Sequence, residues 1–282
     1  MARLDTSDHP RYQGELQYIY PVVSRRAKGV SVGVNLNPND ACNWRCIYCQ
    51  VPGLVSGKGP PIDLERLAGE LESMLADLID GDFMERRVPE GSRRLNDIAF
   101  SGNGEPTSSP DFAEAIETVG AVLEARGLVG KLKLILITNG SLVHKPEVTA
   151  ALARFATLGG QVWFKLDGAS DATLARFNNN PGGIQKQLAN LRIAAATAPT
   201  YVQTALFRFD GAEPMDGEFE AYRAHLAALL EQGVRLAGVH LYSLARPSFQ
   251  PEAPRLERLA QAELETFAER LTELGLVVTA NA

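Results

Sequence analysis

The chain has 282 residues, of which 45% are hydrophobic and 22% are charged, values typical of a globular protein with a sizeable core. Its formal net charge of −6 argues against a global positive field for nucleic acid and leaves room only for a local basic groove. No apolar run reaches the roughly 18 residues that span a bilayer, and the polar residues 1–14 carry no signal-peptide core. We therefore expect a cytoplasmic protein with no membrane partner.

Apolar, β-branched runs alternate along the chain with amphipathic stretches. In residues 64–79, apolar side chains recur at steps of three and four, which predicts a helix with one buried face and Asp63 as its cap. The run 134–137 is apolar on both faces, which is typical of a buried parallel strand. The predicted strands cover residues 30–36, 95–101, 132–138, 161–167, 201–208 and 235–243. The predicted helices cover residues 64–79, 111–125, 145–158, 183–196, 217–231 and 256–274.

Six strand–helix units in this order predict an α/β fold with parallel strands. Right-handed crossovers wind such units into a parallel sheet or an open barrel. A short last strand is expected at residues 276–279. We interpret residues 1–29 as an N-terminal extension, the charged residues 80–94 as a long connection, and residues 1–282 as a single domain with a core of about 30–282.

All three cysteines of the chain, Cys42, Cys46 and Cys49, lie within eight residues. In a long chain without other cysteines, such a group fits a reducing compartment and a metal site better than a disulfide framework. Three thiolates suit a cubane iron–sulfur cluster that keeps one iron open for a substrate or cofactor. The alternative is a structural zinc site, which needs a fourth ligand, and none of the four histidines lies at zinc-finger spacing.

Polar and glycine-rich segments follow the predicted strands, where parallel sheets gather their active sites. Two glycines flank Asn103 and would let the backbone approach a ligand closely. Glu105 supplies an acceptor for an ammonium group, and Asn139 offers the donor and acceptor that a ribose diol requires. Lys165 offers a cation for a carboxylate. Together these groups complement an amino acid joined to a nucleoside and held beside the open iron.

These motifs resemble the radical S-adenosylmethionine (SAM) superfamily. The C-x3-C-x2-C spacing of the cysteines and Tyr48 before the last of them match its signature, and the turn 104–106 looks like its glycine–glutamate motif. The six units look like its partial (β/α)6 barrel, an open TIM-like barrel. A closer likeness is to the subgroup of wyosine-base synthases and related bacterial proteins, although this chain lacks the second cysteine set of the synthases. That likeness rests on residues 33–36, 100–107, 165–167 and 246–247.

The resemblance implies an enzyme with two cofactors, a 4Fe-4S cluster and SAM. One electron from an external reductant of flavodoxin or ferredoxin type cleaves SAM to methionine and a 5′-deoxyadenosyl radical, which takes a hydrogen atom from an unidentified substrate. A peptide, a small metabolite and a modified nucleoside are the open substrate classes, and the acidic charge disfavours nucleic acid. The rival interpretation is a non-catalytic iron–sulfur or zinc-binding protein.

The resemblance also implies roles for individual residues. Cys42, Cys46 and Cys49 are the expected cluster ligands. We expect Tyr242 to contact the cofactor and, with Arg246, to face the substrate. The remaining cofactor contacts that we expect are Asn103, Gly104 and Glu105 at the methionine amine, Asn139 at the ribose, Lys165 at the carboxylate, Asp167 as a further polar contact, and Gln203 and Leu206 on the adenine side.

Overall fold

The computed structural model describes residue 4 and residues 16–24 and 29–282, so 1–3, 5–15 and 25–28 of the expected N-terminal extension lie outside the described residues. The strands are β1 (Ile19–Ser24), β2 (Gly29–Val34), β3 (Ala41–Cys42), β4 (Val55–Ser56), β5 (Leu95–Phe100), β6 (Lys133–Thr138), β7 (Gly160–Lys165), β8 (Thr200–Ala205), β9 (Phe207–Phe209), β10 (Gly238–Tyr242), β11 (Leu256–Arg258) and β12 (Val278–Asn281). The α-helices are α1 (Leu64–Ile79), α2 (Phe83–Arg87), α3 (Phe112–Ala125), α4 (Pro146–Thr157), α5 (Asp171–Asn178), α6 (Gly183–Thr197), α7 (Phe219–Glu231) and α8 (Gln261–Thr272).

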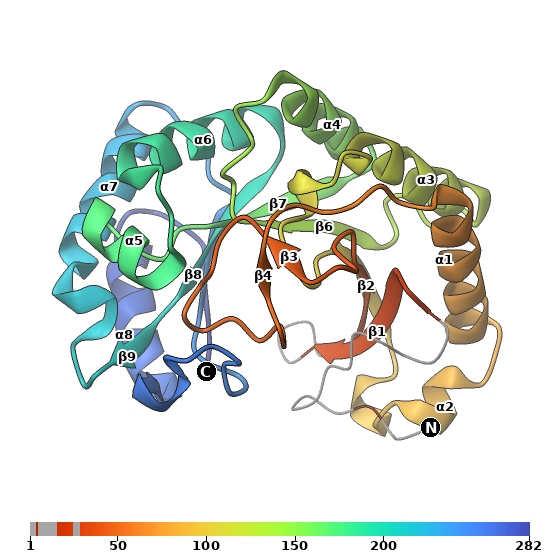
Figure 1. Ribbon diagram of the computed structural model, residues 1–282, viewed down its shortest axis with the longest axis horizontal. Coiled ribbons are helices and arrows are strands. Elements are labelled where there is room, and N and C mark those ends of the chain that lie inside the picture. The colour runs from red at the N-terminus through yellow and green to blue at the C-terminus, as the bar shows by residue number, and fades with distance from the viewer. Residues whose placement is uncertain (1–3, 5–15, 25–28) are drawn as a thin grey trace.

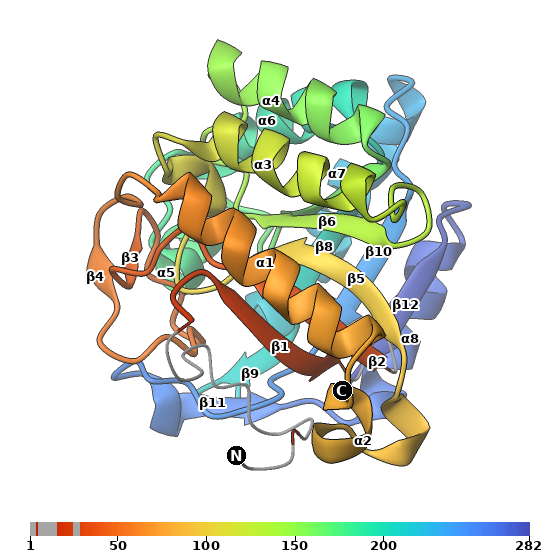
Figure 2. The same cartoon turned by 90° about the vertical axis from the view of Figure 1, so that its right-hand side faces the viewer.

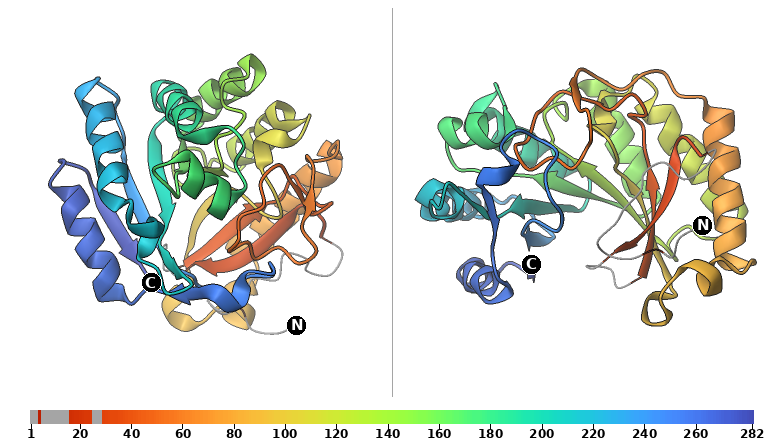
Figure 3. Two further views of the ribbon diagram at one scale, coloured as in Figure 1. Left: turned by 60° about the vertical axis from the view of Figure 1, so that its left-hand side comes forward. Right: turned by 60° about the horizontal axis from the view of Figure 1, so that its bottom comes forward.

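Eight of these strands form one curled sheet in the order β1-β2-β5-β6-β7-β8-β10-β12. Every neighbouring pair from β2 to β12 is parallel, and β1 runs antiparallel to β2. Figures 1 and 3 show the sheet bending into part of a barrel, with the larger helices along its convex side. The predicted α/β fold, an open TIM-like barrel, is therefore confirmed.

Alternation along the strands divides the sheet into a helix-facing side and an interior side. On β2, Val30, Val32 and Val34 are buried in the main hydrophobic core together with the leucines of α1, whereas Ser31 lines an interior cavity. Helices α1, α3 and α4 lie next to one another over the same part of the sheet (Figure 2). The Asp63 carboxylate accepts from the Arg66 backbone nitrogen, which confirms the predicted helix cap.

Several elements differ from the sequence expectation. Strand β1 lies within the expected extension, and residues 80–94 contain the short helix α2. The predicted helix 256–274 begins only at Gln261, because residues 256–258 pair as β11 with β9. The predicted strand 201–208 divides at Leu206, since β8 stays in the main sheet while β9 pairs elsewhere. Helix α5 is an element that the apolar periodicity does not reveal.

Candidate active site

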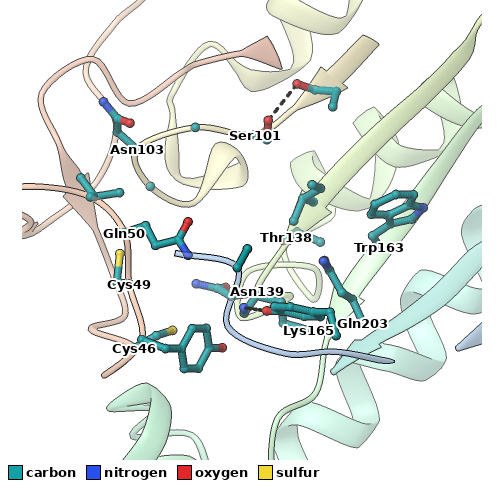
Figure 4. A pocket seen from close by; sticks show the side chains of 18 of the residues that line it. Cys46, Cys49, Gln50, Ser101, Asn103, Thr138, Asn139, Trp163, Lys165 and Gln203 are labelled. Carbon is teal, nitrogen blue, oxygen red and sulfur yellow. Dashed lines mark hydrogen bonds between the residues drawn. The ribbon is translucent and has the colours of Figure 1, made fainter. Parts of the chain in front are cut away.

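A cavity of about 350 Å³ lies inside the curled sheet. Its wall is built by the cysteine loop (residues 42–49) and by inward-facing residues of all eight strands of the main sheet. Figure 4 shows Cys46 and Cys49 on one wall, with Asn139, Lys165 and Gln203 beyond them. The predicted residues that line it are Cys42, Cys46, Cys49, Asn103, Gly104, Glu105, Asn139, Lys165, Gln203, Tyr242 and Arg246.

The cysteine loop is held from both of its ends. Cys42 ends β3, which pairs with β4, and the Gly57 nitrogen donates to the Cys42 carbonyl over 3.0 Å. The Cys49 nitrogen closes a tight turn on the Cys46 carbonyl at 2.9 Å. These backbone contacts bring three thiols that are close in sequence onto the wall of the same cavity.

Burial sets the protonation of these thiols. Desolvation raises the pKa of the Cys42 thiol to about 12 and that of the Cys46 thiol to about 11. Such thiols become thiolates only when a positive centre compensates for the lost hydration. Binding of a metal centre by these thiols must therefore release their protons.

The donor set fits a cubane cluster better than a single ion. Among the described residues, histidine, cysteine and carboxylate side chains form no group of three that could hold one metal ion. A cubane gives each of three thiolates an iron of its own, and therefore does not require the sulfurs to converge on one atom.

The turn after β5 packs directly against the start of the cysteine loop. A Cβ on Gly104 would lie 2.1 Å from the Ala41 carbonyl oxygen, so the backbone contact requires glycine. The Asn103 side chain donates to Asp40 Oδ1 over 2.6 Å, and the Asn103 nitrogen donates to Asn35 Oδ1 over 3.1 Å. The turn is thereby fixed beside Cys42.

Glu105 is buried and bonded to the turn itself. Its Oε1 accepts from the Thr107 nitrogen at 3.1 Å and from the hydroxyls of Thr107 and Thr138, each at 2.6 Å. Its Oε2 accepts from the Asn139 nitrogen at 2.6 Å, and a carboxylate oxygen has a second lone pair that can accept a further hydrogen bond. Desolvation raises the pKa of Glu105, and these hydrogen bonds oppose that rise.

Lys165, at the end of β7, is held as a cation. Its Nζ donates to the Tyr242 hydroxyl over 3.1 Å and lies 3.6 Å from Asp167 Oδ2. Burial opposes the charge, but the attraction of Asp167 and Tyr242 raises the pKa of Lys165 above its ordinary value. A cation fixed at this position can bind a carboxylate.

Asp167 does not line the cavity. Its Oδ1 accepts from the Ala205 nitrogen at 2.8 Å. Its Oδ2 accepts from Asn178 Nδ2 at 2.9 Å and from the Tyr48 hydroxyl. In the structure Asp167 thus lies behind the wall, where it joins β7, β8 and the cysteine loop, and its expected cofactor contact stays a prediction.

Asn139 is engaged with the cysteine loop rather than pointing freely into the cavity. Its Nδ2 donates to Asn43 Oδ1 over 2.8 Å, and its Oδ1 accepts from the Ser141 nitrogen at 3.0 Å. The predicted ribose contact lies at the cavity, with both polar atoms already oriented by neighbours.

The structure places Gln203 and Leu206, both expected on the adenine side, in different surroundings. Gln203 is 3% exposed and lines the cavity, and its Oε1 has no hydrogen-bond partner among the residues that the structure describes. Leu206 belongs to the main hydrophobic core and does not line the cavity. Because β8 ends at Ala205, the inward alternation of side chains stops before Leu206.

The far part of the cavity contains residues that sequence reasoning missed. The Tyr20 hydroxyl and Ser101 Oγ are 2.8 Å apart, and the Ser31 hydroxyl donates to Asp97. Ser31 and Asp97 are polar residues at inward positions of their strands, and Ser31 interrupts an apolar alternation that could have revealed it. Other missed lining residues are Val22, Ser24, Gln50, Ile135, Trp163 and Asn281.

Comparison with known proteins places this geometry in a family. The UPF0026 protein of Helicobacter pylori strain J99 is 30% identical over 136 residues, which cover 48% of this chain and 38% of that protein. The UPF0026 protein of Methanocaldococcus jannaschii is 25% identical over 158 residues, covering 56% and 42% respectively. The chain thus matches less than half the length of these curated relatives, which support the predicted likeness to the wyosine-synthase-like subgroup.

A solved structure described as TYW1 with a lysine-pyruvate adduct bound shares the fold. Its TM-score is 0.56 at 18% identity, over 88% of this chain and 74% of that one. The family model described as the radical SAM superfamily matches residues 36–220, which is more than half of the chain. The chain therefore belongs to the radical SAM superfamily.

Proposed function

We propose that Cys42, Cys46 and Cys49 hold a 4Fe-4S cluster and that SAM binds beside it at the carboxyl ends of β5 to β8. The observation that carries this proposal is the meeting of the three thiols, the turn after β5 and Lys165 on the wall of the same cavity. When bound, the two cofactors supply the reductive cleavage of SAM to methionine and a 5′-deoxyadenosyl radical.

The chain's own groups suit the two charged ends of the amino acid moiety. The open lone pair of Glu105 Oε2 and the backbone of the turn 102–104 accept the ammonium group. The Lys165 ammonium faces the carboxylate, and its ion pair with Asp167 keeps it in place. That ion pair favours an electrostatic role for Lys165 over a nucleophilic one.

The nucleoside end is assigned to Asn139 and Gln203. Asn139 is fixed by Asn43 and Ser141, so its amide reaches a ribose without reorganisation. The buried Gln203 Oε1 is an acceptor that suits the exocyclic amine of adenine. Tyr242, bonded to Lys165, lines this end of the cavity beside Asn281 of β12.

The segment after β10, residues 243–255, closes over the cysteine loop and limits access of water. Ser248 Oγ donates to the carbonyls of Ile47 and Cys49 over 2.8 and 3.1 Å, and the Phe249 nitrogen donates to the Cys49 carbonyl over 2.9 Å. Exclusion of water matters because a reactive carbon radical attacks any accessible bond.

The far part of the cavity is assigned to the substrate. Its walls combine apolar side chains such as Val22 and Ile135 with polar ones such as Ser31 and Asp97. This mixed lining suits a small reacting group, as offered by a small metabolite, a peptide side chain or a modified nucleoside. The net charge of −6 disfavours bulk nucleic acid.

Two further features belong to this proposal. An external one-electron reductant of flavodoxin or ferredoxin type serves the cluster, and residues 1–282 act as one domain. None of the helices in the described part of the chain combines the length and apolar character that crossing a membrane requires.

Anaerobic reconstitution tests the proposed function. Protein loaded with iron and sulfide is incubated with SAM and dithionite, and 5′-deoxyadenosine is measured by mass spectrometry. We expect about four irons per chain, because the cubane has four, and release of 5′-deoxyadenosine that a C46A variant does not show. A loaded protein that leaves SAM intact would support the non-catalytic iron–sulfur alternative, and a protein that takes up zinc but no cluster would support the zinc alternative.

A further inference from the structure

The last residue of α5, Asn178, places its side-chain amide against a cysteine sulfur. Asn178 is fully buried, and its Nδ2 lies 3.3 Å from Cys46 Sγ. The same nitrogen lies 2.9 Å from Asp167 Oδ2 and 3.2 Å from the Tyr48 hydroxyl oxygen. The amide nitrogen therefore faces three acceptors from two elements.

The chemistry of these neighbours dictates which end of the amide points inward. An ionised carboxylate accepts hydrogen bonds and cannot donate them, so Asp167 requires the nitrogen and not the oxygen of Asn178. Asp167 is itself fixed by the Ala205 nitrogen at 2.8 Å. The other end of the amide, Asn178 Oδ1, has no hydrogen-bond partner within the part of the chain that is described. A buried acceptor without a partner is destabilising, and the hydrogen bonds of Nδ2 offset that cost.

The backbone of α5 holds this side chain in register with the cysteine loop. The Ile47 nitrogen donates to the Phe177 carbonyl over 2.8 Å, and the Arg45 nitrogen donates to the Asn178 carbonyl over 3.2 Å. Two backbone bonds on either side of Cys46 thus fix the end of α5. These bonds keep the backbone of Asn178 beside Cys46, so its side chain starts within reach of the sulfur.

We propose that Asn178 is a positioning residue that raises the reduction potential of the cluster by donating a hydrogen bond to the Cys46 thiolate. This inference rests on the proposed function, in which Cys46 is a cluster ligand. One electron from the external reductant adds negative charge to the cluster and its thiolates. A donor at sulfur stabilises that added charge, so it favours the reduced state, while Asn178 keeps both of its amide protons.

The test compares an isosteric variant with a matched control from the same segment. N178L removes the donor and keeps the approximate volume. N180A is the control, because Asn180 is also buried and close in sequence. Its Oδ1 accepts from the Gly182 nitrogen at 2.8 Å, and no hydrogen bond to a sulfur is recorded for it among the described residues. The reconstituted proteins, without SAM, are titrated anaerobically with dithionite at controlled potential, and the reduced cluster is counted by electron paramagnetic resonance.

We expect N178L to lower the ratio of reduced to oxidised cluster at fixed potential on the order of tenfold, which equals about 59 mV for one electron. N180A should retain the wild-type midpoint. If N178L holds no cluster, N178S is measured instead, since its shorter hydroxyl ends before the sulfur, and the same decrease is required.

Two failures are distinguishable. An unchanged midpoint in a loaded N178L or N178S protein would overturn the role of Asn178 and leave the proposed function standing. A wild-type protein that assembles no four-iron cluster would remove the proposed function itself.

Discussion

The Lys165 ammonium lies 4.7 Å from the ring centroid of Tyr48, the residue that precedes Cys49. The Tyr48 hydroxyl donates to Asp167, which also pairs with Lys165 at 3.6 Å. A cation at the end of β7 is thus held between the carboxylate behind it and an aromatic face of the cysteine loop. The loop that carries the thiols and the cation proposed for the SAM carboxylate are parts of the same buried network.

Replacing this cation should affect both folding and SAM binding. K165M leaves the fully buried Asp167 carboxylate without its ion-pair partner, so we expect the free energy of unfolding to fall by about 3–5 kcal/mol. We expect SAM binding to the loaded protein to weaken at least about tenfold, equal to about 1.4 kcal/mol. Urea denaturation and equilibrium dialysis measure the two effects. K58M alters an exposed lysine and should change neither, and normal SAM affinity in K165M would contradict the assignment.

Replacing Gln203 should affect the stability of the fold and the affinity for SAM in different directions. Its buried Oε1 lacks a partner among the described residues, so Q203M removes a desolvated acceptor. We expect the free energy of unfolding without ligand to stay equal or rise by about 1 kcal/mol. SAM affinity should fall about tenfold if that acceptor meets the adenine amine. Thermal unfolding with and without SAM separates the effects, and an unchanged shift on SAM addition would count against the adenine contact.

The turn after β5 should tolerate no side chain at Gly104. In G104A the added Cβ would lie 2.1 Å from the Ala41 carbonyl oxygen, so either the turn or the start of the cysteine loop must shift. We expect iron loading and SAM binding to fall together. G69A is the matched control, because Gly69 lies in α1 with open space at its Cβ, and its helix should gain about 0.5–1 kcal/mol. Full loading of G104A would show that the contact is dispensable.

The segment after β10 should control how long the cluster is retained. S248A removes the hydrogen bonds from Ser248 to the carbonyls of Ile47 and Cys49. We expect the cysteine loop to lose about 1 kcal/mol of stabilisation. Iron should then be lost to a chelator about five times faster than from the wild-type protein. The control S56A changes an exposed serine of β4, and equal rates in the two variants would contradict the role of Ser248.

Most of the sheet and much of the candidate site follow from local sequence patterns. The buried run 134–137 and the periodic face of 64–79 each specify one element, and glycine and polar residues after consecutive strands mark the edge where a parallel sheet binds ligands. Cys42, Cys46 and Cys49 can be placed together for the simpler reason that they are neighbours in the chain.

The parts that escaped prediction depend on contacts between distant segments. Helix α5 has eight residues and is polar on average, so its helical state owes much to the Ser170 cap and to its docking on the cysteine loop. Leu206 follows the apolar pattern of a strand, but the chain leaves the main sheet there to form β9 with β11. The position of Asp167 behind the wall depends on Ala205, Tyr48 and Asn178, which no local pattern brings together.

The bidentate ion pair between Arg45 and Glu252 joins residues 207 positions apart, with oxygen–nitrogen distances of 2.7 and 2.8 Å. Synthesis proceeds at about 5–20 residues per second, so the segment 243–255 leaves the ribosome about 10–40 s after the cysteine loop that it covers. We therefore expect insertion of the proposed cluster to come late in the maturation of this protein. Until then the thiols depend on the reducing power of their surroundings for protection against oxidants.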